Sequence, residues 1–232
     1  MNGKWKQRIA LFWRGWGMSL LIGLLIATTF KSAIADWNYV PSGSMKPTIL
    51  EGDRIFVNKL AYDLKVPFTT WHLATWDNPK RGDIVVFFSP ANGMRLVKRV
   101  VGIPGDVIAL RDNQLFINRE AVHYGPPDSR IVDQMAPGER AQHLFYSEDM
   151  PGKEHAVMFT PSVWSRNSFA QITIPKDHYF MMGDNRDNSA DSRYFGFVDR
   201  SLIVGRVSSV VMSVKPDDHY LPRWDRFFQE LS

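Results

Sequence analysis

Two serines lie one residue apart in a short loop rich in proline and glycine. Residues 41–48 read Pro-Ser-Gly-Ser-Met-Lys-Pro-Thr, so Ser42 and Ser44 flank Gly43. Proline fixes φ and glycine permits turns that other residues resist, which makes such a loop stiff but sharply bent. It could present a hydroxyl nucleophile together with a backbone N–H. The alternative is a polar linker, where these residues are common, and this segment alone favours the linker.

A second candidate for chemistry is Lys98, which lies in the apolar run 95–101. In a strand, Leu96, Lys98 and Val100 point to one face. On a covered face, desolvation would lower the pKa of the amine from about 10.4 towards neutrality, so that it could accept a proton from a serine. On an exposed strand edge, Lys98 would instead be a charge that prevents aggregation. This segment by itself leaves both interpretations open.

The third candidate is residues 183–196, which read Gly-Asp-Asn-Arg-Asp-Asn-Ser-Ala-Asp-Ser-Arg-Tyr-Phe-Gly. Short polar side chains of this kind bond to their own backbone and build tight loops. A calcium loop of the EF-hand type is excluded, because no starting point supplies glycine at the sixth position with the right ligands. A structural polar turn remains the alternative.

The elements that must position these segments are predicted to be mainly strands. The runs are rich in β-branched or aromatic residues, most are bounded by Gly, Pro, Asn or Asp, and residues 111–114 predict a hairpin turn. The predicted strands are 54–58, 83–88, 95–101, 107–110, 114–117, 171–174, 178–182 and 202–214. We predict a catalytic β core of residues 36–119 and 169–214, an inserted subdomain at 120–168, where Pro, Gly and charge break the pattern, and a C-terminal tail at 215–232.

The N-terminal segment is predicted to be a membrane anchor. Residues 1–8 carry Lys4, Lys6 and Arg8 without an acid, and residues 9–30 are apolar except for Arg14. A helix needs about 20 residues to cross a bilayer, and an arginine near one end can snorkel to the surface. The positive flank predicts a cytoplasmic N-terminus and a chain that works outside the cytoplasm after residue 31.

A cleavable signal peptide is the competing interpretation of this segment. Residues 33–35 read Ala-Ile-Ala, which is a small-x-small cleavage pattern. Arg14 and two tryptophans make the apolar segment long and interrupted, and Lys31 intrudes before the cleavage pattern. We therefore predict a retained, single-pass anchor, and leave open whether the chain is ever cut after Ala35.

Composition excludes several classes of site. The chain has no cysteine, which excludes disulfides, thiolate metal sites and a cysteine nucleophile. The net charge is only +4, and the basic residues are spread along the chain rather than interleaved with aromatics, so nucleic acid is not expected as a partner. We predict no metal and no cofactor.

Together the three segments resemble, in order and wording, the conserved boxes of bacterial type I signal peptidases. The resemblance runs from about residue 39 to residue 214, includes residues 51–53 and 79–87, and is most specific at 183–197. It implies a fold of coiled antiparallel sheets with a catalytic core and an inserted β-rich subdomain. It also implies an enzyme of the bacterial cytoplasmic membrane whose catalytic domain lies on the outer side. Its substrates would be exported preproteins with small residues, usually alanine, at the first and third positions before the cut, bound as an added strand.

The resemblance also implies roles for the reacting residues. Ser44 would attack the scissile carbonyl and form an ester acyl-enzyme, with neutral Lys98 as the general base that later activates the deacylating water. The backbone N–H of Ser44 and the hydroxyl of Ser42 would form the oxyanion hole. Ser189 matches the serine that orients the lysine amine by hydrogen bonding.

Supporting roles follow from the same resemblance. Asp191 and Arg193 match an ion pair, and Gly183 and Asp184 match the residues that shape the loop. The candidates for lining the substrate pockets are Val40, Met45 and Leu96. The aromatics that could rest on the lipid bilayer, with core packing as the alternative, are Trp37, Phe68, Trp71 and Trp76.

The sequence departs from the family pattern at a few places. Well-known members have two spans where one is predicted here, and Asn38, Ala190 and Phe195 replace an apolar residue, an acid and a tryptophan. These departures concern substrate preference and not the reaction.

Rival functions are weaker or stay open. The six histidines lack a nucleophile elbow, because Gly-x-Ser-x-Gly is absent, which disfavours a Ser-His-Asp hydrolase. A self-cleaving repressor would need a DNA-binding domain where the predicted anchor lies. An anchored interaction domain is disfavoured because both dyad positions are present. A specialised peptidase, such as the maturation enzyme of a conjugation system, stays open, as does the oligomeric state.

Overall fold

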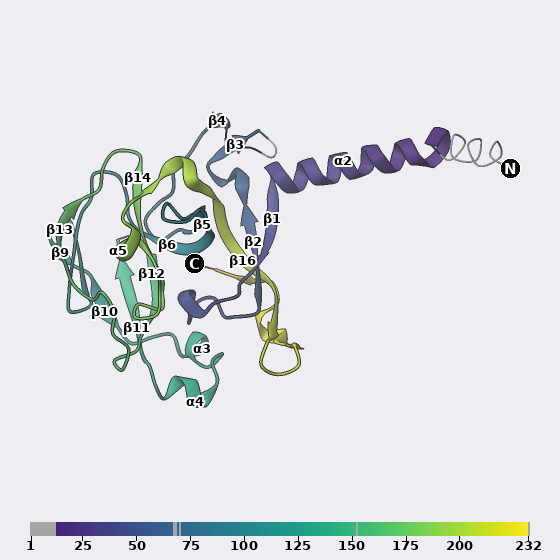
Figure 1. The fold of residues 1–232 in the computed structure, drawn as a ribbon. Helices are drawn as coiled ribbons and strands as arrows, with labels where there is room; N and C mark the ends of the chain where they lie inside the picture. Colours follow the sequence, from purple (N-terminus) through teal and green to yellow (C-terminus); the bar gives the residue numbers. More distant parts are fainter. Residues whose placement is uncertain (1–12, 67–68, 70, 152, 232) are drawn as a thin grey trace.

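The computed structural model describes residues 13–66, 69, 71–151 and 153–231. At the N-terminal end, η1 (Trp13–Gly17) leads into α2 (Met18–Ala33), which projects away from a body built mainly of strands (Figure 1). Within the described residues, no helix combines the length and the apolar character needed to span a membrane. Residues 9–12 of the predicted anchor lie outside the described part of the chain.

One coiled antiparallel sheet carries most of the body. Its strand order is β1-β2-β16-β5-β6-β14-β15, and β17 and β18 also pair with β16. The strands are β1 (Ala35–Tyr39), β2 (Asp53–Asn58), β5 (Ile84–Phe88), β6 (Arg95–Gly102), β14 (His178–Met182), β15 (Val198–Asp199), β16 (Ile203–Lys215), β17 (Leu221–Pro222) and β18 (Gln229–Glu230). The 13-residue β16 holds the sheet together, since it pairs with β2 on one side and β5 on the other.

Irregular pairing bends this sheet. The register shifts between Val207 and Ser209 and between Val210 and Met212 where β16 meets β2. Bulges of this kind bend a strand and increase its twist. A Cβ atom at Gly205 would lie 2.6 Å from the carbonyl oxygen of Asn58, so only glycine allows the backbones to come so close there.

A second group of strands builds the other side of the body. One sheet has the order β13-β7-β8-β9 and another has β10-β11-β12. Their strands are β7 (Val107–Arg111), β8 (Gln114–Ile117), β9 (Glu120–Ala121), β10 (His123–Gly125), β11 (Leu144–Met150), β12 (Lys153–Phe159) and β13 (Phe169–Thr173). The predicted boundaries at 120 and 168 fall within the first of these sheets, and the division into core and insert stays a prediction.

The predicted hairpin between β7 and β8 is confirmed. Arg111 pairs with Gln114, and the two residues between them have positive φ, 48° at Asp112 and 66° at Asn113. Positive φ at both central positions is the geometry of a tight two-residue hairpin turn, which asparagine and aspartate tolerate.

Short elements complete the fold. A hairpin of β3 (Asp63–Lys65) and β4 (His72–Thr75) stands apart from the large sheet. The short helices are η2 (Gly43–Met45), η3 (Lys59–Ala61), α3 (Ser129–Val132), α4 (Pro137–Arg140), α5 (Ser192–Phe195), η4 (Arg200–Leu202) and η5 (Trp224–Arg226). All the predicted strands occur, with their ends displaced by one or two residues at most. The predicted mainly β class is therefore confirmed.

The predicted C-terminal tail is part of the body. It pairs with β16 through β17 and β18, and Arg226 in η5 is fully buried. Its guanidinium lies 2.6 Å from the carboxylate of Asp53 in β2, with neither side chain exposed. Arg226 also donates to the carbonyl oxygen of Thr48 at 3.1 Å, so the tail holds the segment that follows Ser44.

Candidate active site

The loop of residues 41–48, called here the serine loop, follows β1 and makes one turn of 3-10 helix, η2, which carries Ser44. Met45 and Ile49 anchor this turn, since both are buried in a cluster of apolar side chains from the large sheet. On the other side, Asn185 donates from its side chain to the carbonyl oxygen of Gly43 at 3.1 Å. Its backbone N–H donates to the carbonyl oxygen of Ser44 at 3.2 Å. The loop is thus a fixed turn that leaves Ser44 half-buried, and the polar-linker interpretation is wrong.

Lys98 reaches this serine from β6. Its Nζ lies 2.6 Å from Ser44 Oγ and 3.0 Å from the carbonyl oxygen of Val97. β6 lies between β5 and β14, and Lys98 is only 3% exposed, so the strand-edge interpretation is wrong. Lys98 lies on a covered face, since Leu96 and Val100 on either side of it pack in one apolar cluster.

The environment of Lys98 favours its neutral form. Burial lowers the pKa of its amine to about 8, although the carboxylates of Asp191 and Asp184 oppose the shift, and the guanidinium of Arg193 adds to it. Desolvation disfavours the ammonium because the protein interior cannot solvate it as water does. An amine of this pKa is partly deprotonated near neutral pH and lies within hydrogen-bonding distance of a hydroxyl. The pair can therefore move a proton from oxygen to nitrogen.

Gly183 lies directly against the serine loop. A Cβ atom at this position would be 2.4 Å from the carbonyl oxygen of Ser44 and 2.3 Å from Ser189 Oγ. Its backbone N–H donates to the carboxylate of Asp191 at 3.1 Å. Asp191 forms an ion pair with Arg193 at 2.8 Å, and neither side chain is exposed. This part of the loop has no room for a larger residue and is held by a buried charge pair.

Asp184 connects the serine loop to the strand that carries the lysine. Its carboxylate accepts from the hydroxyl of Thr48 at 2.6 Å and pairs with Arg99 at 2.8 Å. Asp184 and Arg99 are both fully buried. Because Arg99 is the neighbour of Lys98, this contact fixes the lysine strand relative to the serine loop. Sequence analysis missed Arg99 and Thr48, although an arginine inside an apolar strand signals a buried carboxylate partner.

Two predicted residues lie close by without the predicted contacts. Ser189 is 7% exposed, and its Oγ has no hydrogen-bond partner among the described residues, so the expected bond to the Lys98 amine is absent. Ser42 precedes η2 in an extended conformation, with φ −135° and ψ 152°, and is exposed. The roles of both serines stay predictions.

The predicted pocket residues lie mostly in the core. Val40 is 5% exposed and Met45 is 1% exposed, and both pack in the apolar cluster beneath the serine loop. Leu96 is half-buried against the neighbouring cluster. A wall of an open pocket would need more exposed surface than Val40 and Met45 offer, and their pocket role stays a prediction.

A buried group of charges lies beyond Asp184, and sequence analysis missed it. Arg186 pairs with Glu148 at 2.6 Å, and His155 Nε2 lies 3.4 Å from the same carboxylate and 3.9 Å from Asp184. Burial and the charges of Arg99 and Arg186 hold the pKa of His155 well below its ordinary value. His155 is therefore neutral and faces carboxylates. The described residues contain no cluster of acids and histidines suited to a metal ion.

Comparison with known proteins gives consistent matches over most of the chain. A family profile described as signal peptidase, peptidase S26, matches residues 13–212. Signal peptidase I of Pseudomonas aeruginosa is 36% identical over 224 residues, covering 91% of this chain and 77% of that protein. Signal peptidase I of Buchnera aphidicola subsp. Schizaphis graminum is 32% identical over 238 residues, covering 88% of this chain and 76% of that protein. A crystal structure of a signal peptidase I from Enterococcus faecalis V583 is 31% identical, covers 57% of this chain and 98% of that chain, and has a TM-score of 0.36.

Proposed function

Because the chain belongs to the signal peptidase family, peptidase S26, and is therefore a serine peptidase, we propose that it cleaves signal peptides from exported preproteins with Ser44 and Lys98 as a catalytic dyad. The observation that carries the assignment of the dyad is the 2.6 Å contact between Ser44 Oγ and Lys98 Nζ, made by a lysine that is 3% exposed. The cut would follow a small-x-small sequence, usually Ala-x-Ala.

The reaction follows from this contact. Neutral Lys98 accepts the hydroxyl proton while Ser44 Oγ attacks the scissile carbonyl carbon, and the carbonyl oxygen takes the negative charge. The tetrahedral intermediate collapses to an ester, and the lysine passes its proton to the leaving amine. Water then gives a proton to Lys98 and attacks the ester, which releases the signal peptide with a new carboxylate and restores the serine hydroxyl. With a pKa of about 8, roughly a tenth of the amine is neutral at pH 7.

The developing oxyanion needs donors. We assign this role to the backbone N–H of Ser44 and the hydroxyl of Ser42, on the family resemblance and on the exposed, extended position of Ser42 directly before η2. Loss of one oxyanion-hole donor typically costs about 2.7–4 kcal/mol in the transition state. Ser42→Ala should therefore lower the turnover number much more than substrate affinity.

The same proposal includes a membrane location. Its support is the apolar sequence of residues 9–30 behind a basic flank, together with exposed aromatic side chains on the body. Trp37, Trp71 and Trp76 are 60%, 74% and 54% exposed, and such rings favour the membrane–water interface. Phe68, the fourth candidate, lies outside the described residues. With its N-terminus in the cytoplasm, the β body would meet preproteins on the outer side of the cytoplasmic membrane.

The test is cleavage of a panel of Ala-x-Ala preproteins by the purified full chain in detergent. We expect Ser44→Ala and Lys98→Met each to abolish cleavage while far-UV circular dichroism is unchanged. Matched controls are Ser162→Ala and Lys176→Met, which replace exposed residues of the same types. Robust processing by either dyad variant would refute the assignment. Cleavage of one specialised precursor alone would favour the narrower maturation peptidase.

A further inference from the structure

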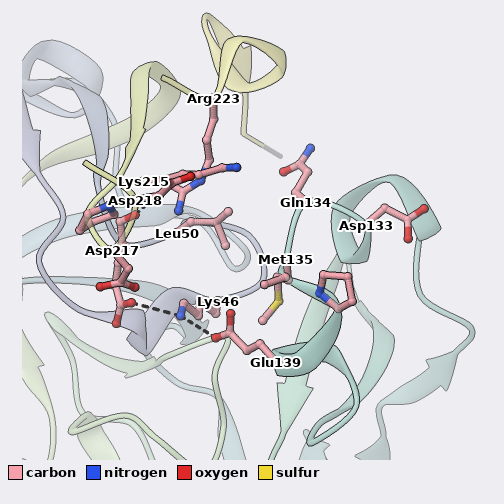
Figure 2. A pocket seen from close by; sticks show the side chains of 14 residues that line it. Lys46, Leu50, Asp133, Gln134, Met135, Glu139, Lys215, Asp217, Asp218 and Arg223 are labelled. Atoms are coloured by element: carbon pink, nitrogen blue, oxygen red, sulfur yellow. Dashed lines mark hydrogen bonds and ion pairs between the residues drawn. The ribbon is translucent and has the colours of Figure 1, made fainter. Parts of the chain in front are cut away.

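Lys46, two residues after Ser44, makes a contact that the proposed reaction does not use. Its Nζ lies 2.6 Å from Glu139 Oε1 and 3.2 Å from Glu51 Oε2. Figure 2 shows Lys46 directed at the carboxylate of Glu139, which comes from α4 across the end of a cavity. Glu139 follows Lys46 by 93 residues and belongs to the segment predicted as an insertion. The contact thus joins that segment to the turn that carries the nucleophile.

The stem of Lys46 lies over that turn. A Cβ atom at Gly43 would be 3.1 Å from both Cδ and Cε of Lys46 and 3.0 Å from Glu51 Oε1. The lysine side chain therefore covers Gly43, whose carbonyl oxygen is held by Asn185. Asn185 therefore binds Gly43 on one side, and the side chain of Lys46 packs against it on the other. The second contact depends on the interactions that hold Lys46 in place.

Lys46 is held by two ion pairs that are partly shielded from solvent. Its side chain is 14% exposed, against 33% for Glu139 and 39% for Glu51. Burial alone would lower the pKa of Lys46, but hydrogen bonds and charge interactions with Glu139 and Glu51 outweigh it and raise the pKa above its ordinary value. Lys46 thus remains an ammonium under conditions in which Lys98 is deprotonated.

The segment that carries Glu139 is also attached near the serine loop by apolar packing. Met135 is 3% exposed and packs with Leu50 and Met158 in a small apolar cluster. Beside it lies a cavity of about 460 Å³, which separates α4 from residues 215–218 of the C-terminal segment. An apolar contact at Leu50 and an ion pair at Lys46 therefore connect the segment around α4 with the segment that follows Ser44.

We infer that Glu139 is a positioning residue for the nucleophile, acting through Lys46 to hold the turn of Ser44 against the amine of Lys98. This inference rests on the proposed function, because it concerns the same serine. Partly exposed ion pairs contribute little to global stability. A displacement of a reacting atom by about 1 Å, however, can lower a rate by about 10²-fold. The ion pair should therefore affect turnover far more than folding.

The experiment compares full-chain variants in detergent on one Ala-x-Ala preprotein, with kcat, KM and melting temperature measured for each. We expect Lys46→Met and Glu139→Gln each to lower kcat by roughly tenfold or more, with KM and melting temperature close to those of the unchanged chain. The double variant should lose no more than Lys46→Met alone, because the contact of Glu139 is already broken when Lys46 is replaced. Lys46→Arg should retain most of kcat, because it keeps the cation.

The matched control is Asp133→Asn. This carboxylate lies in the same segment but pairs with Arg140 instead of Lys46, and it should leave kcat unchanged. Unchanged kcat in Lys46→Met and Glu139→Gln would overturn the positioning role, as would a change in KM alone or a parallel loss of kcat and melting temperature. In those cases Ser44→Ala would still abolish cleavage, and the proposed function would stand. Cleavage that survives Ser44→Ala would instead refute the proposed function.

Discussion

Replacing Lys98 should abolish cleavage and at the same time stabilise the fold. Methionine has a similar length and shape but carries no charge, so Lys98→Met removes the amine without leaving a large cavity. In the unchanged chain the amine is buried on β6 with a pKa of about 8, against an ordinary value of 10.5. The folded state therefore binds this proton less tightly than the unfolded chain does.

The size of the effect follows from that difference. Each tenfold change in proton affinity corresponds to about 1.4 kcal/mol, so the desolvated ammonium costs the folded state roughly 3 kcal/mol at pH 7. The variant also loses the hydrogen bonds to Ser44 Oγ at 2.6 Å and to the carbonyl oxygen of Val97 at 3.0 Å, each worth about 1 kcal/mol. We expect a net gain of about 1 kcal/mol in the free energy of unfolding at pH 7.

The sign of the pH dependence is fixed by the direction of the shift. Between pH of about 8 and 10.5 the unfolded chain binds more protons at this site than the folded chain, so the unchanged protein gains stability as pH rises through this window. The variant does not. The cost of the desolvated ammonium falls by roughly 2.5 kcal/mol between pH 7 and pH 10, so the advantage of the variant should be lost at pH 10.

The measurement is urea unfolding of the full chain in detergent micelles at these two pH values, followed by the fluorescence of its eight tryptophans. Lys176→Met, at an exposed site, is the matched control and should change stability little at either pH. If Lys98→Met is no more stable than the unchanged chain at pH 7, the amine is not desolvated and the reasoning fails.

Other predictions follow from the same geometry. The rate of cleavage should rise with pH through about 8, as Lys98 loses its proton, and a profile that falls over this range would contradict a lysine base. Gly183→Ala should lower kcat more than melting temperature, because its Cβ would lie 2.4 Å from the carbonyl oxygen of Ser44; full activity would show that the loop can shift without cost. Asp53→Asn should destabilise the chain by about 3–5 kcal/mol in urea unfolding, since it leaves Arg226 as an unpaired buried charge; a loss below 1 kcal/mol would mean that water solvates this arginine.

Local patterns were sufficient for much of the fold but not for the reacting pair. The apolar run at residues 95–101 predicted a strand but left open whether Lys98 lies on a covered face or an exposed edge. The asparagine and aspartate between Arg111 and Gln114 predicted a hairpin. The strand and the hairpin each depend on local backbone geometry, which neighbouring residues determine. The resemblance to a known family then supplied the pairing of Ser44 with Lys98, which no local pattern could.

Contacts between distant segments could not be predicted. Arg226 lies 173 residues from Asp53, and Lys46 lies 93 residues from Glu139, so neither pair has a sequence signal beyond unlike charges. The C-terminal segment was predicted as a tail because its short strands and turns carry no clear periodicity. Ser189 is a different case, because the family resemblance predicted a contact that is not found. Its Oγ was expected to hydrogen-bond to the Lys98 amine, and it has no hydrogen-bond partner among the described residues.

The buried ion pairs explain why the site is rigid even though most of its residues are in loops. Three of the pairs include a residue of the lysine strand or of the 183–193 loop, and Arg226 of the fourth pair also donates to the carbonyl oxygen of Thr48 in the serine loop. None of these side chains is more than 1% exposed. The pairs are Arg99–Asp184, Arg193–Asp191, Arg226–Asp53 and Arg186–Glu148. A buried pair adds little net stability over an apolar substitute, but breaking one by removing a single partner is costly. Small displacements of these loops are therefore penalised steeply, and this rigidity can hold a serine and an unprotonated lysine at hydrogen-bonding distance.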